Sequence, residues 1–356
     1  MLSGIDDVRI RELRPVLSPA VLMDEVQPSA AGQETVATTR QQISEILHGR
    51  ADKLLVVVGP CSVHDPNAAL EYAQRLADFR AQVDDQLLLV MRTYFEKPRT
   101  VVGWKGLIND PDLDGSCKIN HGLRIARTLL RDISELGIPA GTEFLDPISP
   151  QFVADLVSWG AIGARTTESQ VHRQFASGLS MPVGFKNGTG GAIKLAADAV
   201  NAAGHAHSFL GVTKQGTCAI VETQGNPDCH VILRGGSAAT NYQAEHVKEA
   251  TEMLTKAGLE PRLMVDCSHG NSRKNHENQP GIARDLAGQL RSESSGIFGV
   301  MVESFLVAGR QDLRLDHPMT FGQSVTDACI DWETTKEVLL ELADAIETRR
   351  SKAHNA

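Results

Sequence analysis

The 356-residue sequence contains no apolar run that approaches the roughly 20 residues needed to cross a bilayer. Its first residues lack the basic and then apolar order of a secretory signal peptide. Basic residues are not in excess, because 35 lysines and arginines against 44 acidic residues give a net charge of -9. This charge argues against a general surface for nucleic acids or anionic membranes. The six cysteines show no paired spacing, so we expect reduced thiols in a cytoplasmic protein.

No Gly-x-Gly-x-x-Gly motif follows a predicted strand, which weakens a dinucleotide-binding interpretation. Short apolar runs instead alternate with segments of helical periodicity. Seven of the eight predicted strands are residues 54–58, 87–91, 161–166, 183–186, 208–213, 262–266 and 299–303. The third strand in chain order leads into residues 141–145. Eight strands that alternate with helices predict an α/β fold, a (β/α)8 TIM barrel, with an open doubly wound sheet as the alternative.

Two segments fall outside this alternation. Residues 1–49 form a predicted N-terminal extension, with a weakly alternating strand at 8–13 and a helix at 34–47. Such an extension either packs on its own barrel or reaches another subunit. Residues 217–223 and 229–233 predict a β-hairpin inserted after the sixth strand. We therefore divide the chain into an extension, residues 1–49, and a barrel, residues 50–356.

One group of residues at or beyond the predicted strand ends has the chemistry of a metal site. In a barrel the carboxyl ends of all eight strands meet at one face. One thiol, one imidazole and two carboxylates would lie there: Cys61, His269, Glu303 and Asp327. Mixed sulfur, nitrogen and oxygen ligands suit a divalent cation. The alternative is that Cys61 is a small buried apolar residue and His269 a solvated loop residue, since no short ligand spacing links them.

A second group at the same strand ends is cationic: Arg92, Lys97, Arg165, Lys186 and Arg234. Buried charge is costly unless it is paired or meets a ligand. Five converging cations favour a dense anion, such as a phosphate next to a carboxylate. The alternative is ion pairing with Glu143, Asp146 and Glu168.

The loop after the second strand offers a further anion site. Lys97, Pro98, Arg99 and Thr100 combine hydrogen-bond donors with a proline that restricts the backbone. This composition suits a second phosphate group. An ordinary basic surface loop is the alternative.

Five stretches in this chain resemble the type I 3-deoxy-D-arabino-heptulosonate-7-phosphate (DAHP) synthases. They are Gly-Pro-Cys-Ser at residues 59–62 and the stretches at 92–100, 160–169, 184–189 and 266–272. The resemblance runs from the extension to the last helix. It implies a metal-dependent TIM barrel that condenses phosphoenolpyruvate with erythrose 4-phosphate, at the first step of the shikimate pathway. The related 3-deoxy-octulosonate-8-phosphate synthases are disfavoured, because they carry Lys-Ala-Asn-Arg-Ser where this chain has Lys-Pro-Arg-Thr at 97–100.

The resemblance also implies roles for individual residues. One divalent ion per subunit (Mn²⁺, Fe²⁺, Co²⁺ or Zn²⁺) would be held by the four candidate ligands. Lys97 would be catalytic together with Cys61 and His269. Phosphoenolpyruvate and erythrose 4-phosphate would contact Arg92, Lys97, Pro98, Arg99, Thr100, Ala164, Arg165, Lys186 and Arg234. A barrel that only senses phosphorylated metabolites is the non-enzymatic alternative, but it is expected to lack either the metal ligands or one phosphate loop.

Regulation is implied in the same way. In this family an aromatic amino acid binds away from the catalytic mouth, in a site completed by another subunit's extension, so a homodimer or homotetramer is expected. The matching positions are Asp6, Asp7, Pro150, Gln151, Ser180, Phe209 and Gly211. The stretches 146–151, 209–211 and 266–272 look most like the tyrosine-sensitive branch. If Gly211 lines the pocket, a glycine there leaves room for the hydroxyl group of tyrosine.

Overall fold

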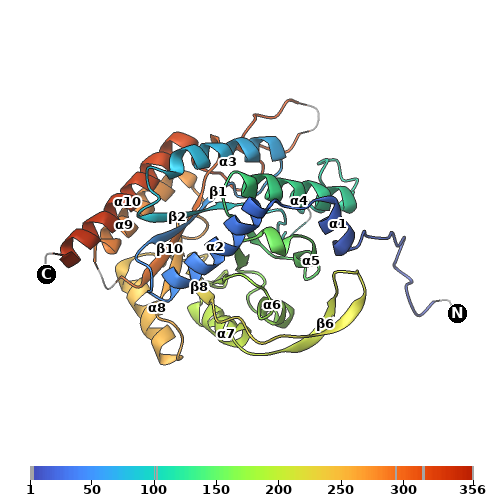
Figure 1. Cartoon of the computed structure of the whole chain (residues 1–356), viewed down its shortest axis with the longest axis horizontal. Coiled ribbons are helices and arrows are strands. Elements are labelled where there is room, and N and C mark those ends of the chain that lie inside the picture. Colours follow the sequence, from blue (N-terminus) through green and yellow to red (C-terminus); the bar gives the residue numbers. More distant parts are fainter. Residues whose placement is uncertain (1–3, 100, 102, 293–294, 315–316, 355–356) are drawn as a thin grey trace.

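Eight parallel strands close into a barrel in the computed structural model, which describes residues 4–99, 101, 103–292, 295–314 and 317–354 (Figure 1). Around the barrel the strands follow the order β1-β10-β9-β8-β5-β4-β3-β2. Their bounds are β1 (Leu54–Gly59), β2 (Leu87–Arg92), β3 (Ala140–Glu143), β4 (Trp159–Ile162), β5 (Val183–Lys186), β8 (Cys229–Leu233), β9 (Leu263–Asp266) and β10 (Ile297–Glu303). The predicted TIM barrel is confirmed.

A helix follows each barrel strand and covers its outer face. These helices are α3 (Pro66–Arg80), α4 (Ile119–Glu135), α5 (Pro150–Val153), α6 (Gln170–Ala176), α7 (Ile193–Ala203), α8 (Ala244–Lys256), α9 (Gln279–Leu290) and α10 (Trp332–His354). Asp65 caps α3 by accepting hydrogen bonds from the backbone of Asn67 and Ala68, and Pro66 occupies the first turn. Among the described residues, no helix combines the length and apolar character needed to cross a membrane.

The extension packs on the chain's own barrel only in part. Its helices are α1 (Pro19–Glu25) and α2 (Ala30–Leu47). Ile43, Ile46 and Leu47 of α2 are buried in one cluster with barrel residues such as Leu55 and Val57, and α2 lies across the barrel in Figure 1. Residues 4–16 are exposed, and the first of them extend away from the barrel in Figure 1. Residues 12–16 lie beside the start of α4, where Asn120 Nδ2 donates to the backbone oxygen of Pro15 at 3.1 Å. The predicted strand at 8–13 is wrong, because that stretch pairs with no described strand.

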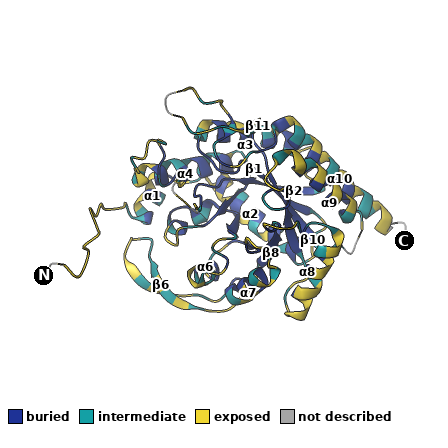
Figure 2. Ribbon diagram, turned by 180° about the vertical axis from the view of Figure 1, so that it is seen from behind, coloured by how far each residue is buried: buried dark blue, intermediate teal, exposed yellow. Residues whose placement is uncertain are grey.

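The inserted hairpin is present, but its strands differ from those predicted. Residues 208–213 were expected to be the sixth barrel strand. They instead form β6 (Ser208–Val212), which pairs only with β7 (Cys218–Glu222) outside the barrel. The place of the sixth barrel strand belongs to β8, which is buried along its whole length. Figure 2 shows that β6 is exposed along part of its length. Leu210 on β6 is 88% exposed, and Ile220 on β7 is 74% exposed.

Two short elements complete the fold near the carboxyl end of β10. They are β11 (Val307–Arg310) and β12 (Gln323–Ser324), which pair with each other. The loop after β12 returns to the barrel mouth and carries Asp327. Short 3-10 turns occur at Ala154–Leu156, after α5, and at His276–Asn278, before α9.

Candidate active site

The carboxyl ends of the strands bring the candidate metal ligands to one face of the barrel. Cys61 follows β1, Glu303 ends β10, and Asp327 lies on the loop after β12. Gly59 makes the β1 turn possible, because it adopts φ of +148° and an added Cβ would lie 3.0 Å from the backbone nitrogen of Arg92. The turn therefore leaves Cys61 at the carboxyl face of the barrel, where side chains from several strands meet.

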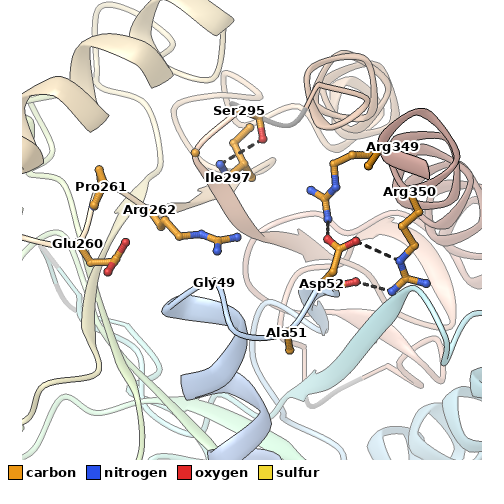
Figure 3. A pocket seen from close by; sticks show the side chains of 12 residues that line it. Gly49, Ala51, Asp52, Glu260, Pro261, Arg262, Ser295, Ile297, Arg349 and Arg350 are labelled. Carbon is orange, nitrogen blue, oxygen red and sulfur yellow. Dashed lines mark hydrogen bonds and ion pairs between the residues drawn. The ribbon is translucent and has the colours of Figure 1, made fainter. Parts of the chain in front are cut away.

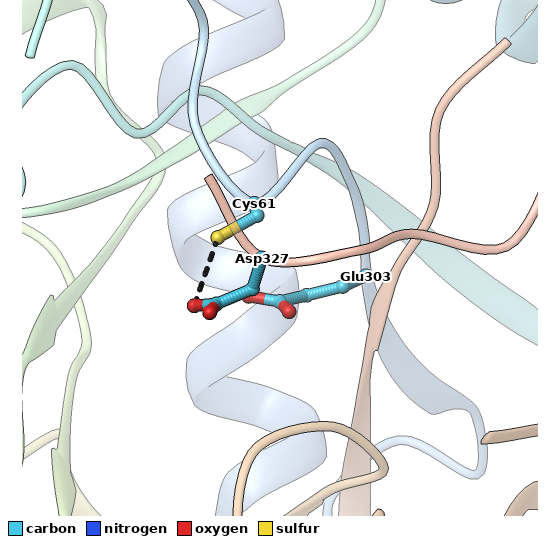
Figure 4. Close-up of side chains that lie close together, drawn as sticks. All are labelled: Cys61, Glu303 and Asp327. Atoms are coloured by element: carbon cyan, nitrogen blue, oxygen red, sulfur yellow. Dashed lines mark hydrogen bonds between the residues drawn. The ribbon is translucent and has the colours of Figure 1, made fainter. Parts of the chain in front are cut away.

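Cys61, Glu303 and Asp327 form a compact group of possible metal ligands. One donor atom from each lies within 4.8 Å of the others, and Figure 4 shows the three side chains pointing toward one another. Cys61 Sγ is 3.4 Å from Asp327 Oδ2. Burial raises the pKa of the Cys61 thiol to about 12, and the negative charge of Glu303 adds to this shift. Cys61 and Glu303 are buried and Asp327 is exposed, so the group opens to the mouth of the barrel. A thiol beside two carboxylates fits a divalent cation better than an isolated structural cysteine.

His269 lies beside this group rather than within it. Its Nε2 is 3.7 Å from Glu303 Oε1, while its Nδ1 is 2.9 Å from Asp266 Oδ2. Asp266 is fully buried at the end of β9 and is also 3.2 Å from Lys186 Nζ. Burial would raise the pKa of Asp266, but His269 and Lys186 hold it well below its usual value. A carboxylate that fixes one ring nitrogen and leaves the other to face a cation is the usual arrangement around metal-binding histidines.

Asp266 was not singled out from the sequence. Its signals were its place at the end of an apolar strand, three residues before His269, and at the start of the stretch 266–272. The structure shows that it orients the imidazole and balances Lys186.

Arg92 and Lys97 approach the same group from β2 and the loop that follows it. The guanidinium of Arg92 is fully buried, donates to Glu303 Oε1 at 3.0 Å, and stacks 3.9 Å from the ring centre of Tyr94. Lys97 Nζ is buried 3.1 Å from Cys61 Sγ. Burial alone would lower the pKa of Lys97, but Cys61, Glu303 and Asp327 raise it. Lys97 is therefore held as an ammonium ion.

The remaining predicted cations line a cavity of about 130 Å³ at this mouth. Its lining includes Lys97, Pro98, Arg99, Ala164, Arg165, Lys186, Arg234, His269 and Asp327. Glu143 also lines this cavity, but among the described residues the five cations form no ion pair with Glu143, Asp146 or Glu168. Arg92 and Lys186 pair instead with Glu303 and Asp266. Arg165 donates to the backbone oxygen of Pro98 at 2.9 Å, and Arg234 reaches the oxygen of Gly235. Thr100 lies outside the described residues.

A carboxyl group below the basic loop was also missed. Glu96 is buried and accepts hydrogen bonds from Ser149 Oγ at 2.7 Å and from the backbone nitrogen of Asp146 at 3.2 Å. Burial raises the pKa of Glu96 to about 7. Glu96 thus ties the loop that carries Lys97 to the turn that precedes α5.

A sequence model of the DAHP synthetase I family matches residues 31–340, which is most of the chain. The chain belongs to the DAHP synthetase I family. A relative in Escherichia coli K12, named phospho-2-dehydro-3-deoxyheptonate aldolase, Phe-sensitive, is 57% identical, with 97% of this chain and 98% of the relative covered. A tyrosine-inhibited relative in Schizosaccharomyces pombe is 50% identical, with 97% and 94% covered.

The fold of the DAHP synthetase I family is also found among solved structures. A phospho-2-dehydro-3-deoxyheptonate aldolase from Francisella tularensis matches with a TM-score of 0.94 and 50% identity, covering 96% of this chain and 99% of that one. The similarity therefore extends over the extension and the barrel together.

The positions matched to the effector site of the DAHP synthetase I family lie together only in part. Gln151 in α5 contacts the hairpin, because its backbone oxygen accepts a hydrogen bond from Lys214 Nζ at 2.6 Å. The loop before Ser180 also contacts the hairpin, since Ser177 Oγ lies 2.6 Å from Thr223 Oγ1.

Within the hairpin and at the start of α5, the matched side chains differ in exposure. Pro150 is buried at the start of α5, and Phe209 packs partly buried against the core. Gly211 pairs with Ala219, and an added Cβ would lie 2.7 Å from Val221 Cγ2. This contact leaves no space for a larger residue at 211 unless Val221 moves.

Asp6 and Asp7 do not join these residues within one chain. Both side chains are exposed on the part of the extension that points away from the barrel (Figure 1).

Proposed function

We propose that this chain is a 3-deoxy-7-phosphoheptulonate synthase, which condenses phosphoenolpyruvate with erythrose 4-phosphate and releases inorganic phosphate. The observation that supports this most is that the candidate metal ligands and the cation-lined cavity lie side by side at one end of the barrel. A thiol and two carboxylates converge within 4.8 Å, and the cation-lined cavity opens beside them. Relatives that are 50% to 57% identical carry the corresponding name.

The donor set fits one divalent ion, with Mn²⁺, Fe²⁺, Co²⁺ and Zn²⁺ as candidates. Cys61, Glu303 and Asp327 would hold it, and His269 would complete the set through Nε2. When bound, the ion supplies Lewis-acid polarisation to the aldehyde oxygen of erythrose 4-phosphate.

Four of the five predicted cations line the cavity, Lys97, Arg165, Lys186 and Arg234, and they would bind and orient both substrates together with the buried Arg92. Arg92, Arg165, Lys186 and Arg234 would hold the phosphate and carboxylate of phosphoenolpyruvate, and the loop formed by Lys97, Pro98, Arg99 and Thr100 would hold erythrose 4-phosphate. Carbon 3 of phosphoenolpyruvate then bonds to the aldehyde carbon. Holding two reactants in this orientation removes much of the entropic barrier to a two-body reaction.

Lys97 is placed to deliver the proton that the reaction needs. Its ammonium lies 3.1 Å from Cys61 Sγ, at the junction of the candidate metal ligands and the cavity. In our proposal Nζ donates a proton to the aldehyde oxygen as the carbon–carbon bond forms. Water adds to the positive carbon 2, and the resulting hemiketal phosphate loses inorganic phosphate.

The extension and the barrel would have different roles. We assign residues 1–49 to subunit contact and regulation and residues 50–356 to catalysis, in a homodimer or homotetramer. The exposure of Asp6 and Asp7 on a projecting segment supports the subunit contact. The six cysteines include no disulfide, which supports a reducing, cytoplasmic location.

Inorganic phosphate release tests the proposed reaction. We expect release only when both substrates and a divalent ion are present, loss of release after a chelator is added, and recovery with Mn²⁺. Omitting either substrate serves as the control. Full activity in a metal-free preparation contradicts the metal assignment, whereas binding of both substrates without any release supports the sensor alternative.

Feedback inhibition by tyrosine is the expected regulation. Identity over the whole chain does not select the effector, because Phe-sensitive and tyrosine-inhibited relatives are both 50% or more identical. The choice of tyrosine is supported by the resemblance of residues 146–151, 209–211 and 266–272 to the tyrosine-sensitive branch. Initial rates with each aromatic amino acid should fall most with tyrosine, and inhibition by phenylalanine or tryptophan alone contradicts this choice. Deleting residues 1–16 should remove the inhibition and leave the rate without effector intact.

A further inference from the structure

A second pocket lies at the opposite end of the barrel from the candidate active site (Figure 3). We call it the strand-start pocket, because its lining includes residues that immediately precede β1, β9 and β10, together with the end of α10. It has a volume of about 530 Å³, and its lining includes Gly49, Asp52, Glu260, Arg262, Ser295 and Arg350. A six-residue strand separates the two barrel ends by roughly 20 Å, so this pocket shares no space with the catalytic cavity.

Two of the three arginines in the strand-start pocket already have partners. Asp52 forms ion pairs with both Arg349 and Arg350. The Nε of Arg350 is 3.2 Å from Asp52 Oδ2. Arg350 also reaches Asp85 at 2.8 Å. These contacts fasten α10 to the segment before β1 and leave Asp52 with no need for a further cation.

Arg262 is different, because it forms no hydrogen bond or ion pair with any residue that the structure describes. Its guanidinium extends across the pocket above Gly49 in Figure 3. Glu260 does not pair with it and instead lies 3.7 Å from His48 Nδ1. Arg262 is half-buried, and burial lowers its pKa. A partly desolvated cation without a partner is costly, and a bound anion removes that cost.

The surroundings of Arg262 leave space for such an anion. A Cβ added at Gly49 would lie 2.7 Å from Arg262 Nη1, so the glycine keeps the guanidinium accessible. Gly49 also has φ of +70°, which by itself favours glycine. Ser295 also lines the pocket, and its Oγ accepts a hydrogen bond from the backbone nitrogen of Ile297 at 3.4 Å. A serine hydroxyl can in addition donate to an anion.

We propose that the strand-start pocket binds a small oxyanion, a phosphate or carboxylate group of a metabolite, with the fork of Arg262 as its main donor. A guanidinium binds either group through two parallel hydrogen bonds. The bound anion would lie between the residues that precede β1, β9 and β10 and the end of α10, and it would hold these segments closer together. The site is independent of the proposed reaction, because none of its residues lies at the catalytic mouth.

Hydrogen–deuterium exchange during titration with inorganic phosphate tests this site on the full chain. We expect protection of residues 49–53, 260–263 and 295–297, with an apparent affinity that falls tenfold to a hundredfold in Arg262→Ala. Arg262→Lys keeps the charge without the fork and should give an intermediate loss. Segment 95–99 at the catalytic mouth is the internal reference, and its response to phosphate should not change in either variant.

The matched control is Arg291→Ala, which removes an arginine that pairs with Asp344 at 3.1 Å and does not line the pocket. It should keep the wild-type response to phosphate. A parallel titration with succinate shows whether carboxylate or phosphate binds more tightly. Equal protection by sodium chloride at matched ionic strength, or an unchanged titration in Arg262→Ala, overturns the proposal.

Discussion

Replacing Cys61 with serine should abolish metal-dependent phosphate release while the barrel stays folded. The thiolate is the softest candidate ligand, and a serine hydroxyl is a poor replacement for it. Loss of metal polarisation removes several kcal/mol of transition-state stabilisation, so we expect kcat to fall by roughly 10³-fold or more. The measurements are initial rates at saturating Mn²⁺ and metal content after dialysis.

Burial of Cys61 favours the protonated thiol, so metal binding has a second consequence that can be measured. Burial raises the pKa of Cys61 to about 12 in the absence of a cation. A bound divalent cation reverses this effect and deprotonates a coordinating thiol. Metal binding by the wild-type chain should therefore release a proton that Cys61→Ser does not release.

Cys267→Ala is the matched control for Cys61. Cys267 is equally buried and belongs to the same apolar core as Cys61, but it is not part of the group in which Cys61, Glu303 and Asp327 converge. Its loss should change the unfolding midpoint slightly and leave metal content and activity unchanged. If Cys61→Ser keeps more than a tenth of the wild-type rate and its metal, Cys61 is a packed thiol and the metal site is wrongly assigned.

The barrel and its mouth were predictable because each depends on a local pattern with one consequence. Continuous apolar runs such as residues 54–58 are fully buried strands, and the residue after such a run must lie at the carboxyl face. That rule alone brought Cys61, Arg92 and Glu303 together, although they are far apart in the sequence.

The errors arose where short apolar runs have no local feature that fixes their partner. Residues 208–212 and 229–233 are both five-residue strands with apolar centres. Their periodicity does not reveal which one enters the barrel, because that choice depends on packing against β5 and β9. The packing of the extension was unpredictable for the same reason. The surface that buries α2 exists only after the barrel has formed, so no local pattern in residues 30–47 reveals it.

Single polar residues were missed for a related reason. Asp266 and Glu96 gain their roles from partners that are distant or weakly marked in sequence, such as Lys186 and Ser149. The strand-start pocket had no sequence signal either. Arg262 became notable only because the fold half-buries it without a partner.

Replacing Lys97 with methionine should lower kcat by roughly 10²-fold to 10⁴-fold, the range expected for loss of a general acid. Methionine keeps much of the length and removes the ammonium. Because Lys97 Nζ contacts Cys61 at 3.1 Å, metal content must be measured in parallel with the rate. Lys194→Met, at an exposed lysine that pairs with Asp198, is the control and should behave as wild type.

Lys97→Arg separates the two roles that a lysine can play at this position. Arginine keeps the positive charge for the substrates, but it does not give up a proton near neutral pH. If Lys97 donates the proton, Lys97→Arg should keep substrate affinity near the wild-type value and lose kcat almost as strongly as Lys97→Met. If Lys97 acts only through its charge, Lys97→Arg should recover most of kcat. Recovery of that size contradicts the proton-donor role and leaves Lys97 as a binding residue at the junction of the two sites.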